Sequence, residues 1–223
     1  MSDPARRRRL REQWFDVGLV TGVAASIAYA LGVFIPIPPR PEYLFFMAFG
    51  PLFCISSVGL YVFLCEHRET VSLQVGLLCL IAAGLMFTAM ATMQGSIIFQ
   101  IREFIAQGDP NETELWRTVF RGTMATQLGL DFGFDMFVSA GTFLVAWNVA
   151  SHPRFWRWFG WLGMLVSIVG LTFNAITFPE NSGEVGLVDP APFFGVWFGG
   201  FVLVFGLSRR WFRQQPVRTV DSP

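Results

Sequence analysis

The chain has 223 residues, of which 53% are hydrophobic and 14% are charged, and its formal net charge is zero. A soluble domain usually contains about 25% charged residues, so this composition excludes an ordinary soluble domain and indicates a protein that lies in lipid. The apolar runs are continuous over about 20 residues, which also excludes a membrane β-barrel, whose strands alternate over about ten residues.

The first half of the chain predicts a basic tail followed by three membrane helices. Residues 1–16 are rich in arginine, and we expect them to form a cytoplasmic tail. Uncharged runs then predict helices over 17–37, 43–65 and 71–100, because about 20 helical residues span the roughly 30 Å of hydrocarbon. The connections between them are short, so neighbouring helices should pack antiparallel.

A polar segment, residues 102–121, follows the third predicted helix, and we expect it on the outer side of the membrane. Asn111 or Thr113 could be the N-cap of a helix that continues into the fourth span, residues 122–150. The sequence leaves open whether the whole segment is helical.

The fourth predicted span contains two consecutive tetrads that each end in an aspartate, Asp131 and Asp135. Their period of four places Gly129 and Gly133 on one face, where another helix could approach closely. Each aspartate is about 200° round the helix from these glycines. The opposite face is therefore a polar stripe, made of Gln127, Asp131, Asp135, Ser139 and Thr142.

The two aspartates are the most informative residues, because they lie near the middle of the bilayer. A carboxylate at that depth costs about 2.5–3.5 kcal/mol to insert and usually faces the interior of the bundle or water. Carboxylates at positions i and i+4 also repel each other, and a shared proton or a bound cation would relieve the repulsion. The alternative is that both only fasten the fourth span to its neighbours through hydrogen bonds.

The last part of the chain predicts two further spans, 158–178 and 191–208, separated by an acidic loop. Residues 209–223 then form a second basic tail. The prediction is an all-α polytopic bundle in which residues 17–208 form a single six-helix transmembrane domain. Twelve of the sixteen arginines fall on one side of this arrangement, so the positive-inside rule places both the N- and C-termini in the cytoplasm.

Neutral polar residues on other spans lie at depths similar to that of the aspartates. Gln94 on the third span and Asn174 on the fifth, together with Gln127, suggest a polar pocket that opens outward. The predicted binding residues are Asp131, Asp135, Gln127, Gln94 and Asn174. Any single amide could instead be a contact between helices worth about 0.6 kcal/mol.

Enzyme interpretations find little support. His67 and His152 fall at inner helix ends, no H-E-x-x-H motif is present and no lysine exists for a Schiff base. We therefore predict no catalytic residue, no metal site and no cofactor, and an intramembrane enzyme is the least favoured hypothesis.

The expected partners are the lipid bilayer, a small solute or proton, and a second copy or partner subunit, with no nucleic acid. The small-residue faces that could bind another subunit contain Gly18, Gly22, Gly129, Gly133, Gly195 and Gly199. Two similar hexapeptides, 55–60 and 166–171, also raise the possibility of an inverted repeat.

The C-terminal part of the chain carries a family resemblance in its motifs His152-Pro153-Arg154-Phe155, Thr177-Phe178-Pro179 and Gly186-Leu187-Val188-Asp189-Pro190. With Gly195-Val196-Trp197, this stretch resembles the last two spans of small bacterial membrane proteins grouped under a domain of unknown function. The resemblance implies six spans and a bacterial inner membrane, and it implies no activity.

The leading hypothesis is a protein that binds or transports a small solute or cation in an outward-facing pocket at Asp131 and Asp135, with possible coupling to protons. The competing hypothesis is an accessory or scaffold subunit whose polar residues only fasten helices together.

Overall fold

A computed structural model describes residues 4–35, 39–108, 110–178, 180 and 185–216, and within them the chain is helical with no strand. The helices are α1 (Pro4–Phe34), α2 (Pro39–Cys65), α3 (Val71–Ser96), the π-helical turn η1 (Ile97–Ile101), α4 (Arg102–Gln107), α5 (Pro110–Val149), α6 (Arg157–Thr177), α7 (Ala191–Leu207) and α8 (Arg209–Gln214). The all-α class is confirmed.

Five of the described helical stretches are long and apolar enough to cross a membrane, and they correspond to the first five predicted spans. The sixth predicted span is α7, an apolar helix of 17 residues. The last two residues of the first predicted span, 36 and 37, lie outside the described residues, as do 1–3 and 217–223 of the two tails. Six crossings and cytoplasmic termini stay predictions.

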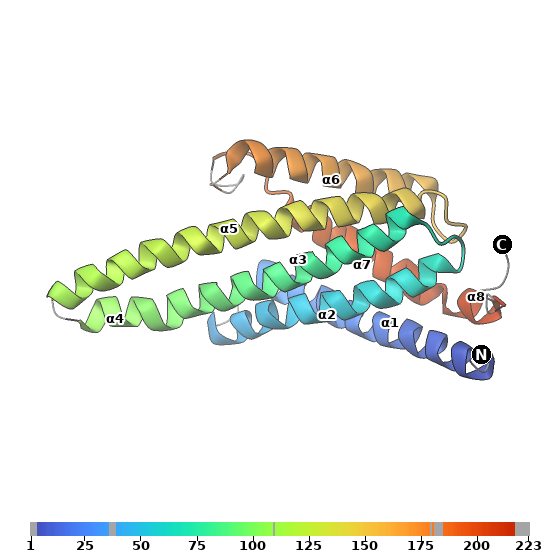
Figure 1. Cartoon of the computed structure of the whole chain (residues 1–223), viewed down its shortest axis with the longest axis horizontal. Coiled ribbons are helices and arrows are strands. Elements are labelled where there is room, and N and C mark those ends of the chain that lie inside the picture. Colours follow the sequence, from blue (N-terminus) through green and yellow to red (C-terminus); the bar gives the residue numbers. More distant parts are fainter. Residues whose placement is uncertain (1–3, 36–38, 109, 179, 181–184, 217–223) are drawn as a thin grey trace.

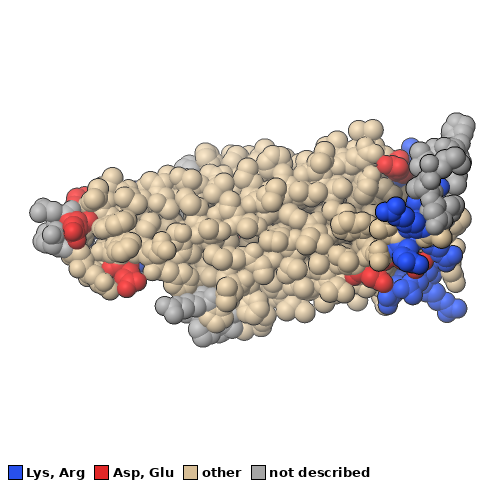
Figure 2. Space-filling view, turned by 60° about the horizontal axis from the view of Figure 1, so that its bottom comes forward, with Lys and Arg blue, Asp and Glu red and all other residues tan. Residues whose placement is uncertain are grey.

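The long helices form a closed ring, in which α1 packs on α2, α2 on α3, α3 on α5, α5 on α6, α6 on α7 and α7 on α1. The start of α1, α8 and the connections after α2 and α5 lie at one end of the bundle (Figure 1). Arginines cluster at this end, which we call the basic end, and the band between the two ends carries almost no charge (Figure 2). Such an uncharged band is the surface expected of a protein surrounded by lipid.

The polar segment 102–121 is helical over 102–107 and 110–121, with a bend at Gly108, and it projects beyond the rest of the bundle as part of a pair of helices (Figure 1). The helix expected to continue into the fourth span is α5, which has 40 residues. The expected cap is wrong, because α5 already begins at Pro110, ahead of Asn111 and Thr113. Proline suits the first helical position because no N–H is needed there, and the Thr113 hydroxyl instead donates to the Gly108 carbonyl at 3.3 Å.

The predicted small-residue faces differ in whether another part of the chain packs against them. An added Cβ on Gly18 would lie 2.5 Å from the Gly59 Cα, so α1 and α2 cross at a point that only glycine allows. Gly22 and Gly195 also meet side chains within the chain, and Gly133 is in ordinary contact with Met86. Among the described residues, nothing lies within 4 Å of a Cβ added at Gly129 or Gly199. No described helix of the same chain therefore packs closely there, and a contact with another subunit at these two glycines stays a prediction.

The basic end is held together by Arg11, which connects three segments that are distant in the sequence. Its Nε lies 2.7 Å from a Glu66 carboxylate oxygen, in an ion pair whose two side chains are only 9% and 11% exposed. Its other nitrogens donate to the carbonyls of Phe212 at 2.6 Å and Gln215 at 3.1 Å. Arg11 thus joins α1 to the turn after α2 and to α8.

Candidate functional site

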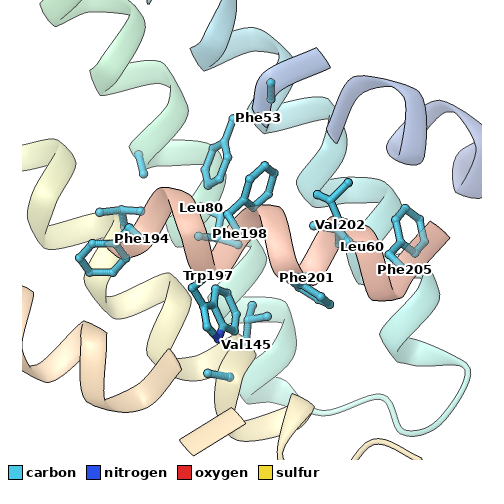
Figure 3. Packing of buried hydrophobic residues seen from close by; sticks show 14 of the residues in the cluster. Phe53, Leu60, Leu80, Val145, Phe194, Trp197, Phe198, Phe201, Val202 and Phe205 are labelled. Carbon is cyan, nitrogen blue, oxygen red and sulfur yellow. The ribbon is translucent and has the colours of Figure 1, made fainter. Parts of the chain in front are cut away.

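A cavity of about 370 Å³ runs along the inside of the ring and is lined by residues from all six long helices. Four buried aromatic residues of α7, Phe194, Trp197, Phe198 and Phe201, form much of one wall. Figure 3 shows Phe198 facing Phe53 of α2 and Trp197 near Val145 of α5. The spacing of these residues on α7, at i, i+3, i+4 and i+7, is that of one helix face.

The polar groups of the cavity gather toward the end opposite the basic end. Asp131 and Asp135 come from α5, and Asn174 lies one turn before α6 ends. Tyr29 of α1 and Asp189, just before α7, complete this group. Asp135 is close enough to Asp131, Asp189 and Tyr29 to interact electrostatically with each of them.

No arginine or histidine is found among the described residues that line the cavity. Asp189 is exposed at the rim, where a carboxylate oxygen accepts a hydrogen bond of 2.9 Å from the Ala191 N–H. Three carboxylates therefore share one space without a cationic side chain in its wall. Chemically, such a group accepts protons or attracts a cation.

Toward the basic end the cavity wall becomes apolar. Leu60, Leu80, Val145 and Phe201 line this part, and the polar residues of the wall outside the acidic group are Ser26 and Thr142. The indole N–H of Trp197 is already used, because it donates to the Phe159 carbonyl at 3.0 Å. The cavity thus has an acidic end and an aromatic and aliphatic end.

Three of the five predicted binding residues, Asp131, Asp135 and Asn174, line this cavity together. Gln127 is 5% exposed and buried in the bundle, but it is not part of the cavity wall. Gln94 is half-buried on α3 and also lies outside the wall. A binding role for these two residues stays a prediction.

Sequence reasoning missed Tyr29 and Asp189 as members of the group. Tyr29 had a possible signal, since a tyrosine hydroxyl within an apolar span needs a polar neighbour. Asp189 had none, because it is one of several acidic residues in its loop and only the fold shows that it reaches the cavity.

Within the part of the chain that the structure describes, no group of three His, Cys, Asp or Glu residues is arranged to hold a metal ion. No family model, curated protein or solved structure matches this chain.

Proposed function

We propose that this protein is a six-span inner-membrane protein that binds a cationic solute in its central cavity and carries it across the bilayer, with Asp131 and Asp135 exchanging the cation for a proton. The observation that carries this proposal is the position of both carboxylates in a cavity whose described wall has no cationic side chain. Intramembrane carboxylates in such surroundings are typical of ion pathways and proton relays.

The proposed orientation places the basic end in the cytoplasm, in agreement with the positive-inside rule. The acidic end of the cavity, with Asp189 at its rim, then faces outward. With 17 residues and a rise of about 1.5 Å per residue, α7 spans about 25 Å. This length is at the lower limit for a membrane crossing and supports the sixth span of the proposal.

The second candidate function, an accessory or scaffold subunit, is favoured by a different surface. An open apolar groove of about 470 Å³ lies between α1 and α7 and includes Leu19, Val23, Gly199 and Leu203. No described residue lies within 4 Å of a Cβ added at Gly199. A helix of a partner subunit could lie there, since small residues allow close approach in membranes.

The decisive experiment measures proton uptake into proteoliposomes with an entrapped pH-sensitive dye, comparing the wild type with Asp131→Asn and Asp135→Asn. We expect either substitution to reduce uptake at least about tenfold while the purified variant stays folded. The matched control is Asp16→Asn, which removes a carboxylate from an exposed ion pair with Arg209 at the basic end and should leave uptake unchanged.

Unchanged uptake in both cavity variants, or no uptake by the wild type under any added cation gradient, would refute the transport proposal. Loss of folding in both cavity variants, with no uptake in the wild type, would support the fastening role that belongs to the scaffold alternative.

A further inference from the structure

The two ends of the central cavity differ in chemistry, and this difference specifies a ligand more closely than a cavity of one polarity would. Its carboxylates lie at one end and its aromatic and aliphatic residues extend toward the other. The volume of about 370 Å³ lies within the range of pockets for small organic molecules, about 300–1,000 Å³. A bound water requires only about 15 Å³, so the cavity is much larger than a single ion requires.

A small inorganic ion does not fit the composition of the wall. Calcium requires about six to eight oxygen ligands, and magnesium requires a nearly ideal octahedron. Most of the described lining residues are Phe, Leu, Val and other apolar types, which offer no oxygen from their side chains. An ion bound at Asp135 would therefore leave the apolar end of the cavity without an occupant.

Aromatic rings lie beside the carboxylates and can also attract a positive charge. Tyr29, Phe134 and Phe194 line the cavity with Asp131 and Asp135. A cation over an aromatic face is attracted by the electrons of the ring, and quaternary ammonium groups are recognised in this way. The acidic end therefore suits an organic cation with a low cost of dehydration.

The apolar end adds a requirement for a hydrophobic body on the same ligand. Phe198 and Phe201 are 8% and 1% exposed and face this part of the cavity with Leu80. Since the Trp197 N–H is bonded to Phe159, the wall offers few donors to a polar substituent. Burying an apolar group there is favourable in proportion to the apolar area that is removed from water.

From these features we propose that the cavity binds an amphipathic organic cation, with its positive group among Asp131, Asp135 and Asp189 and its apolar body between the aromatic residues of α7 and those of α2 and α3. This inference rests on the proposed function, because it names the class of cation that the same cavity receives.

The test is a series of three probes on the detergent-solubilised full chain, by isothermal titration and by quenching of tryptophan fluorescence. Benzyltrimethylammonium has a positive charge and an apolar aromatic body, and tetramethylammonium has the charge alone. Neopentylbenzene has the shape of benzyltrimethylammonium without its charge. We expect benzyltrimethylammonium to bind at least about tenfold more tightly than either of the others, which corresponds to about 1.4 kcal/mol. This comparison requires no variant.

Two substitutions then assign the two ends of the ligand. Asp135→Asn should weaken benzyltrimethylammonium binding at least about tenfold. Phe198→Ala should weaken benzyltrimethylammonium and leave tetramethylammonium unchanged. The matched control is Phe193→Ala on the same helix, where the ring is 53% exposed on the outer surface and outside the cavity wall.

The inference is overturned if tetramethylammonium or sodium binds the wild type as tightly as benzyltrimethylammonium does. It is also overturned if neopentylbenzene binds as tightly as benzyltrimethylammonium in both the wild type and Asp135→Asn. These results are distinct from failure of the proposed function. If proton uptake depends on Asp135 while no organic cation is preferred, the transport proposal survives and only the ligand class is wrong.

Discussion

Mild acid should destabilise the basic end of the bundle through His152, which lies in the connection between α5 and α6. The imidazole is 2% exposed, and its ring packs against Phe63, Phe155 and Trp211 at centroid distances of 4.9, 5.5 and 5.4 Å. Its Nδ1 accepts a hydrogen bond of 3.2 Å from the Arg154 N–H. Protonation of Nδ1 would break this bond and leave a charge among aromatic rings.

Burial is the main reason that the pKa of His152 falls from 6.5 to about 3, and the positive charges of His67 and Arg154 lower it further. Between about pH 3 and pH 6.5 an unfolded chain binds a proton at His152, whereas the folded chain does not. Stability from this residue is therefore complete above about pH 6.5 and is lost as the pH falls toward 3. At about 1.36 kcal/mol per pH unit, the loss between pH 6.5 and pH 5 is about 2 kcal/mol.

The assay is equilibrium unfolding in mixed micelles at pH 7 and at pH 5, comparing the wild type with His152→Asn. Asparagine keeps an acceptor for the Arg154 N–H and cannot be protonated. We expect the wild type to lose about 2 kcal/mol more than His152→Asn over this pH change. The matched control His67→Asn, at an exposed histidine 5.4 Å away between ring centroids, should keep most of the acid sensitivity of the wild type, because burial of His152 is the larger cause of its lowered pKa. An equal loss in the wild type and in His152→Asn would refute this reasoning.

Two further predictions concern packing, and both are checked by the same unfolding measurement at pH 7. Arg11→Ala should cost about 3–5 kcal/mol, because it removes the cation 2.7 Å from the carboxylate of Glu66, whose side chain is only 11% exposed. Arg8→Ala breaks an exposed pair on one helix and should cost about 0.3–0.5 kcal/mol. Similar losses in the two variants would contradict the role of burial. Gly59→Ala should cost about 1–3 kcal/mol, since its Cβ would meet the α1 backbone. The control Gly199→Ala should change stability by less than about 0.5 kcal/mol. If Gly59→Ala does not change stability, α1 and α2 can separate at this crossing without cost, which would contradict the prediction.

The helical class and the location of the long helices could be predicted because lipid leaves few alternatives. Every backbone N–H and C=O in hydrocarbon must be bonded within the segment, so a long apolar run has to be a helix. The ionisable stripe on α5 was predictable for a related reason, since polar side chains at that depth turn inward. Asp131, Asp135 and Thr142 do line the cavity, and Gln127 and Ser139 are buried beside it.

The glycine contacts could not be assigned from spacing, because a small residue shows that a helix can approach without showing which one does. Gly59, which forms the closest crossing with Gly18, belongs to none of the predicted glycine pairs. Gly129 belongs to a well-spaced pair and meets no neighbour. Only the fold determines which of these faces is used.

The aromatic wall of the cavity could not be predicted from the sequence, for a different physical reason. In water, the inner face of a helix is apolar and the outer face is polar, so a pattern of hydrophobicity reveals both. In lipid, both faces are apolar: Phe194 and Phe198 face the cavity, while Phe193 and Val196 are 53% and 70% exposed on the outer surface of the same helix. A polar stripe can therefore locate the charged end of a site in a membrane protein, whereas the part that selects the body of a ligand becomes visible only when the helices are placed around it.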